Sequence, residues 1–363
     1  MVVTGILVGV VFLIAALSFV PMLPSPRWWI RALEFPRLQI LGLQVMSFLA
    51  AFWHGAQVGL VLMVGLGVAM ATQIVHIWPF TPLCRKEMRR THEDSAQDIT
   101  CLAMNVLMEN QNHAAVCAEI ARVDADVVFL METDAIWDAA LAKVLATYPT
   151  IVREIKDNYY GLIFATRLKV RSIKVAYLSV EDTPAVIAEL ESPDGTPFRY
   201  LGLHPKPPVP GEDTEGRDAE VAYAARHAKE TGMPVIAMGD FNTPAWSQIA
   251  HRFKVVGGYL DPRVGRGPLP SFDANRWWLR IPIDQFYATE EVCLVRFRRG
   301  RKVGSDHFPM LARVRMNDPD AARRLNRRVT ALPDAEEDRV LRAIERQGQR
   351  LKKVTRHASP PAP

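Results

Sequence analysis

The stretch PVIAMGDFNTPAWS, residues 234–247, ends an apolar segment on an acid and an amide. Its first half has the composition of a buried strand, and Asp240, Phe241 and Asn242 follow almost at once. In layered α/β proteins, ligands bind where loops leave the ends of strands. We therefore predict that Asp240 and Asn242 face a ligand and that Phe241 points back into the core. The Pro-Ala-Trp that follows is predicted to begin the next helix.

Similar polar residues occur at other strand ends between residues 98 and 317. Segments that read as strands end at Asn105, Glu132 and His204, one opens at Asp284, and the last follows Asp306 and His307. Each residue alone has a simpler explanation, for example Glu132 as the cap of a helix that begins near Ala135, or Asp284 as the partner of Arg280. The recurrence of this arrangement along one domain favours a shared site instead.

Strands and helices alternate along residues 98–317, which predicts an α/β domain, and runs of successive strands predict mixed sheets. The predicted helices cover residues 113–123, 136–148 and 215–232. The predicted strands cover residues 98–106, 125–134, 160–167, 169–178, 185–192, 198–204, 234–240, 283–289, 291–299 and 308–316.

Taken in order, these motifs resemble the endonuclease/exonuclease/phosphatase superfamily. The matching stretches are MNV at Asn105, LMET at Glu132, GLHPKPP at His204, GDFN at 239–242, PID at Asp284 and GSDHFP at 304–309, so the resemblance covers residues 98–316. GDFN with a downstream SDH is a specific pair, whereas MNV or PID alone is weak. The resemblance implies a four-layered α/β sandwich, with two packed mixed sheets and outer helices. It also implies hydrolysis of a phosphodiester or phosphomonoester with Mg²⁺, or with Mn²⁺ as a substitute.

The resemblance gives three residues a role in holding the metal. Glu132 is a hard oxygen ligand suited to Mg²⁺, Asn105 adds a neutral amide oxygen or a bridging water, and Asp306 is a further ligand. Two residues depart from the pattern. Met131 stands where a Gln is usual, and Gln285 stands where this subgroup usually has His. Neither change removes a group needed for catalysis, but both alter the surroundings of the site.

The five remaining residues have expected catalytic roles. Asp240 would orient the attacking water, and Asn242 would contact the phosphate or position that water. Asp284 would fix the ring of His307, and the two would form an acid–base pair. His204 would donate to a phosphoryl oxygen or to the leaving group. Which histidine is the acid and which is the base stays open.

The first 80 residues contain three long uncharged runs, at about 1–23, 38–54 and 57–78. Spanning a bilayer takes roughly 20 apolar residues, so we predict three transmembrane helices, the last two joined by a tight turn at 54–57. Tryptophans near the ends of these runs are typical of membrane interfaces. A signal peptide is a poor alternative for the first run, because no basic residue precedes it and no A-x-A-like site follows. The arrangement resembles a bacterial membrane-bound subgroup of the superfamily.

The basic residues that flank the runs predict the topology. Arg27, Arg31 and Arg37 follow the first run, and four more bases lie between residues 85 and 90, after the third. Positive residues mark the cytoplasmic side, so we predict a multi-pass protein of the inner (cytoplasmic) membrane with a cytoplasmic catalytic domain after a linker at 81–97. The four cysteines form no C-x-x-C pair, which argues against a zinc knuckle and a disulfide framework.

The formal net charge of +5 comes from the two flanks. Residues 1–97 carry +3 and the tail, 318–363, carries +4, whereas the domain at 98–317 holds 26 Lys/Arg and 28 Asp/Glu. The domain therefore lacks the bulk charge of a duplex binder. The tail is predicted as a charged helix with a Pro-rich end.

The substrate stays open between a lipid headgroup, a small phosphorylated metabolite and nucleic acid. A nuclease acting on DNA or RNA is one alternative, because the basic run VRFRRGRK, residues 295–302, lies between two motifs, although a solvated turn explains the run equally well. Trp277 and Trp278 would stack on a base, enter a lipid interface or pack in the core. A membrane-tethered interaction module without activity is the alternative from another class.

Overall fold

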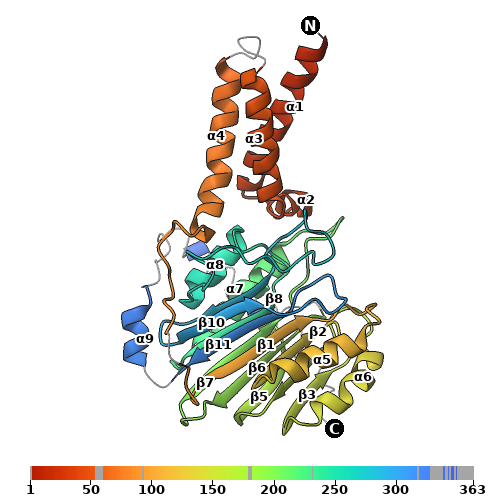
Figure 1. The fold of residues 1–363 in the computed structure, drawn as a ribbon, viewed down its shortest axis with the longest axis vertical. Helices are drawn as coiled ribbons and strands as arrows, with labels where there is room; N and C mark the ends of the chain where they lie inside the picture. Colours follow the sequence, from red (N-terminus) through yellow and green to blue (C-terminus); the bar gives the residue numbers. More distant parts are fainter. Residues whose placement is uncertain are drawn as a thin grey trace.

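The computed structural model describes residues 2–53, 60–91, 94–178, 182–230, 232–316 and 319–327, with isolated helical positions between 338 and 349. Three helices stand on one end of a domain built from two sheets (Figure 1). The predicted turn at 54–57 and most of the predicted tail helix lie outside the described residues. The tail begins with a short helix, α9 (Pro319–Leu325).

The first sheet has six strands in the order β10-β11-β1-β2-β4-β3. They are β1 (Ile99–Asn105), β2 (Val127–Met131), β3 (Thr150–Glu154), β4 (Leu162–Thr166), β10 (Cys293–Arg299) and β11 (Met310–Arg315). β1 pairs in parallel with β2 and antiparallel with β11, so this sheet is mixed.

The second sheet has five strands in the order β5-β6-β7-β8-β9. They are β5 (Lys169–Tyr177), β6 (Pro184–Glu191), β7 (Pro197–Leu203), β8 (Val235–Asp240) and β9 (Asp284–Ala288). β7 and β8 are parallel and the other pairs are antiparallel, so this sheet is mixed as well.

Helices cover the outer face of each sheet: α5 (His113–Val123) and α6 (Ala135–Leu145) on the first, α7 (Glu215–Lys229) and α8 (Gln248–Gly257) on the second. The inner faces pack together around residues such as Phe129 and Tyr200. In β1, Cys101 and Ala103 face the other sheet while Leu102 and Met104 face the helices. Because both faces are buried, the strand reads as a continuous apolar run. The predicted α/β domain with two mixed sheets and outer helices is confirmed.

Two local predictions need correction. β3 is missing from the predicted strands, because it lies at the edge of the first sheet, is mostly half-buried and lacks a continuous apolar run. Helix α8 begins at Gln248, not at the Pro-Ala-Trp of 244–246. The hydroxyl of Ser247 caps it by accepting from the amide of Ala250 (3.1 Å). The indole of Trp246 instead donates to the carbonyl of Glu34 (2.7 Å), outside the domain.

Three helices occupy the predicted spans: α1 (Val2–Phe19), α3 (Arg37–Trp53) and α4 (Leu60–Ile77). The end of α1, the start of α3 and the end of α4 all lie at the domain side of the bundle (Figure 1). Among the described residues, one helical stretch, Leu62–Phe80, is long and apolar enough to cross a membrane by length and composition. Val11–Met22 and Arg37–Trp53 are apolar but shorter.

A buried polar network joins the three helices. The side-chain amides of Gln44 and Gln73 both donate to the hydroxyl of Ser18 (2.6 and 2.9 Å), and Arg37 donates to the side-chain oxygen of Gln73 (2.9 Å). All four side chains are buried. In an apolar surrounding such hydrogen bonds hold helices in one relative position.

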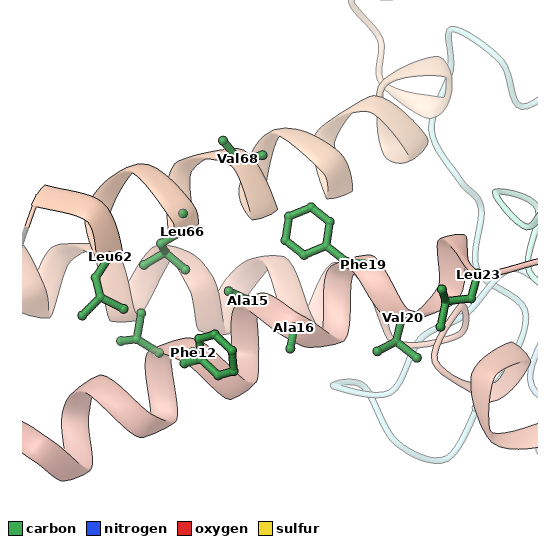
Figure 2. A pocket seen from close by; sticks show the side chains of 11 residues that line it. Phe12, Ala15, Ala16, Phe19, Val20, Leu23, Leu62, Leu66 and Val68 are labelled. Atoms are coloured by element: carbon green, nitrogen blue, oxygen red, sulfur yellow. The ribbon is translucent and has the colours of Figure 1, made fainter.

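An apolar pocket of 610 Å³ lies between α1 and α4 (Figure 2). Phe12, Phe19, Leu62 and Leu66 are among the side chains that line it. Large apolar side chains on α3 and elsewhere on α4 are also exposed, including Leu49 and Trp53 on α3 and Leu60 and Val75 on α4. Exposed apolar surface of this kind is typical of sites that contact a membrane or a partner.

The segment expected as a linker, 81–97, packs against the domain over part of its length. Met88 is fully buried in the core between the sheets, and the amide of Thr91 donates to the carbonyl of Leu294 (2.9 Å). Glu87 pairs with Lys254 on α8 (2.6 Å). The helices are therefore tied to the domain through packed contacts.

Candidate active site

The strand topology brings the polar residues to one edge of the two sheets. In the first sheet β1 ends at Asn105 beside Met131, the last residue of parallel β2, and Glu132 comes directly after. In the second sheet β7 and β8 are parallel, and Asp240 at the end of β8 pairs with Asp284 at the start of antiparallel β9. His204 directly follows β7, and Asp306 and His307 precede β11, which runs antiparallel to β1.

Gly239 allows the second sheet to deliver Asp240. Its φ is +149°, and a Cβ atom built there would lie 2.1 Å from the carbonyl oxygen of Leu203 on β7. Because that contact is with backbone, no side-chain movement relieves it. The glycine of the GDFN motif is therefore required for β8 to lie this close to β7, just before His204.

Asn105 connects the two sheets across the site. Its side-chain amide donates to Glu132 (2.7 Å) and to Asp240 (3.1 Å). The backbone amide of Met108 donates to the second oxygen of Glu132 (3.2 Å). Glu132 has a φ of +62°, and α6 is capped by Asp134, so Glu132 is not the helix cap that its position alone suggests. A non-glycine residue in this conformation requires support from its surroundings, which is common at functional sites.

His307 lies between two buried carboxylates. Its Nδ1 is 2.7 Å from Asp284 Oδ2 and its Nε2 is 3.6 Å from Asp240 Oδ2. The ligand-type atoms of Asp240, Asp284 and His307 all lie within 4.8 Å of one another. Asp284 therefore contacts the histidine and not Arg280, which packs over the ring of Phe308 at 4.8 Å. Asp284 fixes the His307 ring and leaves Nε2 turned toward Asp240.

His204 and Asn242 complete the second-sheet side of the site. His204 Nε2 is 3.8 Å from Asp240 Oδ2, and its buried Nδ1 has no hydrogen-bond partner among the described residues. Asn242, with a φ of +49°, donates its backbone amide to Asp240 Oδ1 (2.9 Å) and its side-chain amide to the carbonyl of Pro205 (3.0 Å). Asn242 thus holds the loop that follows His204. Phe241, between Asp240 and Asn242, is fully buried against α8, which confirms the prediction that it points back into the core.

Asp306 stands at the open side of the group. Its carboxylate is 4.0 Å from His307 Nε2, and its side chain is 29% exposed. Ser305, which the sequence analysis did not single out, is fully buried and links the end of β1 to the segment before β11. Its hydroxyl donates to the carbonyl of Asn105 (2.9 Å) and accepts from the amide of His307 (3.0 Å). In the sequence, Ser305 could have been recognised as a site residue from its position directly before Asp306 in the GSDHFP motif.

The carboxylates of the site repel one another in a buried setting. Burial raises the pKa of Glu132 to about 7, with a contribution from Asp240. Burial likewise raises the pKa of Asp240 and that of Asp306. Burial lowers the pKa of His204, whereas Asp284 and Asp240 outweigh burial and raise the pKa of His307 to about 10.

This donor set fits a hard divalent cation. Glu132 and Asp306 offer carboxylate oxygens, a ligand type that Mg²⁺ prefers. The amide oxygen of Asn105 is of a suitable type as well, but it accepts from the amide of Leu107 (3.0 Å), and the nitrogen faces Glu132 and Asp240. A cation near Glu132 and Asp240 would offset the repulsion that raises their pKa values. The compact group of Asp240, Asp284 and His307 is built differently, because Asp284 and His307 are hydrogen-bonded to each other.

Met131 and Gln285, which differ from the residues that the resemblance leads us to expect, both make hydrogen bonds within the structure. The sulfur of Met131 accepts a hydrogen bond from the amide of Asp240 (3.2 Å), across the two sheets. Gln285 is fully buried beneath the site and donates to the carbonyl of Thr243 (2.7 Å) in the loop after Asn242. Both residues therefore position the strand and loop that carry Asp240 and Asn242.

Comparison with known proteins gives the fold and the family. A crystal structure of D. rerio TDP2 humanized by 14 mutations is 16% identical, with a TM-score of 0.52 over 60% of this chain and 99% of that chain. D. rerio TDP2 complexed with a single-strand DNA product is 18% identical, with a TM-score of 0.51 over 61% and 99%. An endonuclease/exonuclease/phosphatase from Bacteroides vulgatus is 17% identical, with a TM-score of 0.50 over 61% and 99%.

At these identities the likeness shows the fold alone. No curated protein matches the chain. A family model described as "Endonuclease/Exonuclease/phosphatase family" matches residues 102–307, more than half of the chain and from within β1 to His307. The protein therefore belongs to the endonuclease/exonuclease/phosphatase family.

Proposed function

We propose that the protein is a membrane-anchored, divalent-metal-dependent phosphoesterase. One observation carries this proposal: three polar side chains from three separate strand ends surround one oxygen, Asp240 Oδ2, at 3.1–3.8 Å. They are Asn105 at the end of β1, His204 after β7 and His307 before β11. Membership of the endonuclease/exonuclease/phosphatase family supports phosphate-ester hydrolysis as the reaction class. The arrangement of polar groups around Asp240 suits the same reaction. The fold alone does not specify a reaction, so the proposal rests on the site.

The proposed roles follow from the contacts. Glu132, Asn105 and Asp306 would hold Mg²⁺, and the bound ion would supply positive charge to the phosphoryl oxygens. Asp240 accepts a hydrogen bond from Asn105 on the oxygen that faces the two histidines, and it would orient the attacking water. His307, fixed by Asp284, presents Nε2 for proton transfer or for a hydrogen bond to the phosphate.

His204 and Asn242 act from the second sheet. His204 Nε2 faces the same carboxylate oxygen as His307 does, so the two rings bracket the place where a phosphate would bind. Asn242 would keep His204 there through its hydrogen bond to Pro205. The roles expected from the sequence, a direct contact with the phosphate or the positioning of the attacking water, are retained as part of the proposal.

The helices support the membrane anchor. A helix of 18 residues is about 27 Å long, close to the hydrocarbon thickness of a bilayer. Acyl chains would cover the apolar pocket between α1 and α4, which Phe12 lines (Figure 2). They would also cover the exposed Leu49 and Val75. We propose that α1, α3 and α4 span the inner membrane and that the catalytic domain is cytoplasmic. A reporter fused after Arg327 should be active in the cytoplasm; activity only outside would overturn this topology.

The activity is tested with the full-length protein in detergent and with bis(4-nitrophenyl) phosphate as substrate. We expect hydrolysis that requires Mg²⁺ or Mn²⁺ and stops with EDTA. Asp240→Ala and His307→Ala should each lower kcat by about 10²–10⁴-fold, since each removes a positioned polar or proton-transfer group. Asp126→Asn, at the opposite end of the first sheet, is the control. Full activity in both site variants would refute the mechanism, and inactivity of the wild type on all phosphate esters would favour an interaction module.

A further inference from the structure

Two loops at the edge of the site are hydrogen-bonded to the segment 20–36, which joins α1 to α3. The amide of Thr214, in the loop that follows His204, donates to the carbonyl of Pro26 (2.8 Å). The indole of Trp246, in the loop that follows Asn242, donates to the carbonyl of Glu34 (2.7 Å). The loops that carry the catalytic groups therefore lie directly beneath the helices.

A third loop, residues 271–283, is held to the site at both ends. The amide of Ala274 donates to the carbonyl of Asp306 (2.6 Å). The hydroxyl of Ser271 accepts from the amide of Asp284 (3.0 Å), and the amide of Ser271 donates to the carbonyl of Ile281 (3.1 Å). The base of this loop is thus fixed against two residues of the site.

The tip of the same loop is apolar, basic and exposed. Trp277 is 82% exposed and Trp278 is 57% exposed. Packing in the core therefore does not account for the presence of two tryptophans here. Arg276 beside them is exposed as well. The carbonyl of Trp278 accepts from the side chain of Gln39 (2.9 Å), within the first turn of α3. The tip therefore lies level with the start of a helix that we place in the membrane.

Tryptophan has a large apolar ring and one N–H group, and it is enriched where hydrocarbon meets water. Two adjacent tryptophans left in water expose a large apolar area, whereas the interfacial layer of a bilayer accommodates both. Arg276 on the same tip would face anionic headgroups. Trp29 on α2 (Trp28–Ala32), in the segment that joins α1 to α3, is also exposed (42%).

We propose that Trp277 and Trp278 dock in the interfacial layer of the membrane that anchors the protein, and that the site hydrolyses a phosphoester carried by a membrane lipid. The proposal rests on the proposed function, because it names the substrate class of that same site. The loop links the two parts of the proposal, since its tip meets the bilayer and its base holds Asp306 and Asp284. A lipid headgroup at the bilayer surface would then lie next to the three loops.

The docking is tested without any activity measurement. Full-length protein is placed in phosphatidylcholine–phosphatidylglycerol vesicles with and without brominated phosphatidylcholine, and tryptophan fluorescence is recorded for the wild type and for Trp277→Phe/Trp278→Phe. We expect the wild type to lose additional fluorescence to the brominated lipid, which the double variant lacks. Equal quenchable fluorescence in both proteins would show that the tip stays in water and would overturn the docking.

The substrate class is tested by comparing two chromogenic esters in the same vesicles. One is the water-soluble bis(4-nitrophenyl) phosphate, and the other is a nitrophenyl phosphodiester that carries a hexadecanoyl chain. Trp277→Ala/Trp278→Ala should lower kcat/KM for the acylated ester by about tenfold and for the soluble ester by less than about twofold, because only the lipid-borne group depends on docking. The Phe/Phe variant should keep most of the activity on both.

Ile136→Ala, which removes an exposed apolar side chain from α6, is the matched control and should change neither rate. Equal losses on both esters in the Ala/Ala variant would overturn the lipid assignment and indicate a structural role for the loop. A selective loss on a single-stranded oligonucleotide would overturn it in favour of stacking on bases. Failure of the wild type to hydrolyse either ester would contradict the proposed function, while the quenching result would still decide the docking.

Discussion

Asp284→Asn isolates the charge of one carboxylate without changing its shape. Asp284 is 1% exposed, and its Oδ2 lies 2.7 Å from Nδ1 of His307. The amide oxygen of Asn retains a hydrogen bond, so the loss is the charge-assisted part of the interaction. A hydrogen bond to a charged group contributes about 1.5–3 kcal/mol and one between neutral groups about 0.5–1.5 kcal/mol, so the loss is about 1–1.5 kcal/mol, which corresponds to a decrease of about 5- to 13-fold in kcat if it supports the transition state. A wrong ring orientation would add to this loss.

The assay is the hydrolysis of bis(4-nitrophenyl) phosphate by the full-length protein, with thermal unfolding as the test of folding. We expect kcat to fall and KM to change little, because His307 acts on the reacting group and not on remote binding. Asp126→Asn is the matched control: this carboxylate accepts from the amide of Thr100 (2.7 Å) at the far end of β1. A kcat for Asp284→Asn within about twofold of the wild type, at unchanged stability, would show that His307 needs no charged partner.

Three further predictions concern stability and metal binding. Asp261→Ala should destabilise the protein by about 3–5 kcal/mol in urea unfolding, because it leaves the guanidinium of Arg263, which is 1% exposed and bonded to Asp261 at 2.9 and 2.7 Å, without its charge partner. Replacing both residues with apolar ones of similar volume should recover much of that loss, and a cost no larger than that of a surface variant would contradict this. Glu119→Gln should cost about 1.5 kcal/mol at pH 7. Burial raises the pKa of Glu119, but the hydrogen bonds from Arg122 and from the amide of Arg301 lower it below 4.5, so the difference from the wild type should persist above pH 4.5 and shrink as pH falls below it. A pH-independent difference would argue against the ionised group. Mg²⁺ at 100 times its Kd should stabilise the wild type by about 2.7 kcal/mol, EDTA should reverse this, and Glu132→Gln should weaken it, whereas an equal shift in the variant would place the ion elsewhere.

The sequence predicts the fold well because most strands are buried on both faces. Apolar runs such as 99–104 and 127–131 stand out from their polar flanks, and both are strands. The failures occur where burial is partial. β3 is half-buried at a sheet edge, and the start of α8 was misplaced because Trp246 contacts the segment between α1 and α3 through its indole, a contact that no local pattern reveals.

The identities of the candidate site residues were predictable, but their partners were not. Strand-end positions placed Asp240 and Asn105 at an edge of their sheets, yet the 3.1 Å hydrogen bond between them depends on how two sheets pack together. Sequence spacing carries no information on that packing. The same holds for Asp284, whose alternative partners in the sequence were His307 and Arg280. Asp284 lies in the second sheet and His307 precedes β11 of the first sheet, so their 2.7 Å contact also depends on how the sheets pack.

Gln285 illustrates how a departure from a family pattern becomes intelligible once its partners are known. Its side-chain nitrogen donates to the carbonyls of Thr243 (2.7 Å) and Pro282 (3.1 Å), and its oxygen accepts from Arg263 and from the hydroxyl of Tyr287 (3.2 Å). An amide has two donors on one atom and two acceptor positions on the other, which matches this set. A neutral histidine has one donor and one acceptor, so it would leave at least two of these buried groups unpaired. The residue at 285 and the buried Arg263 therefore depend on each other, and Gln285→His, the residue that the resemblance led us to expect, should be tolerated only if Arg263 changes as well.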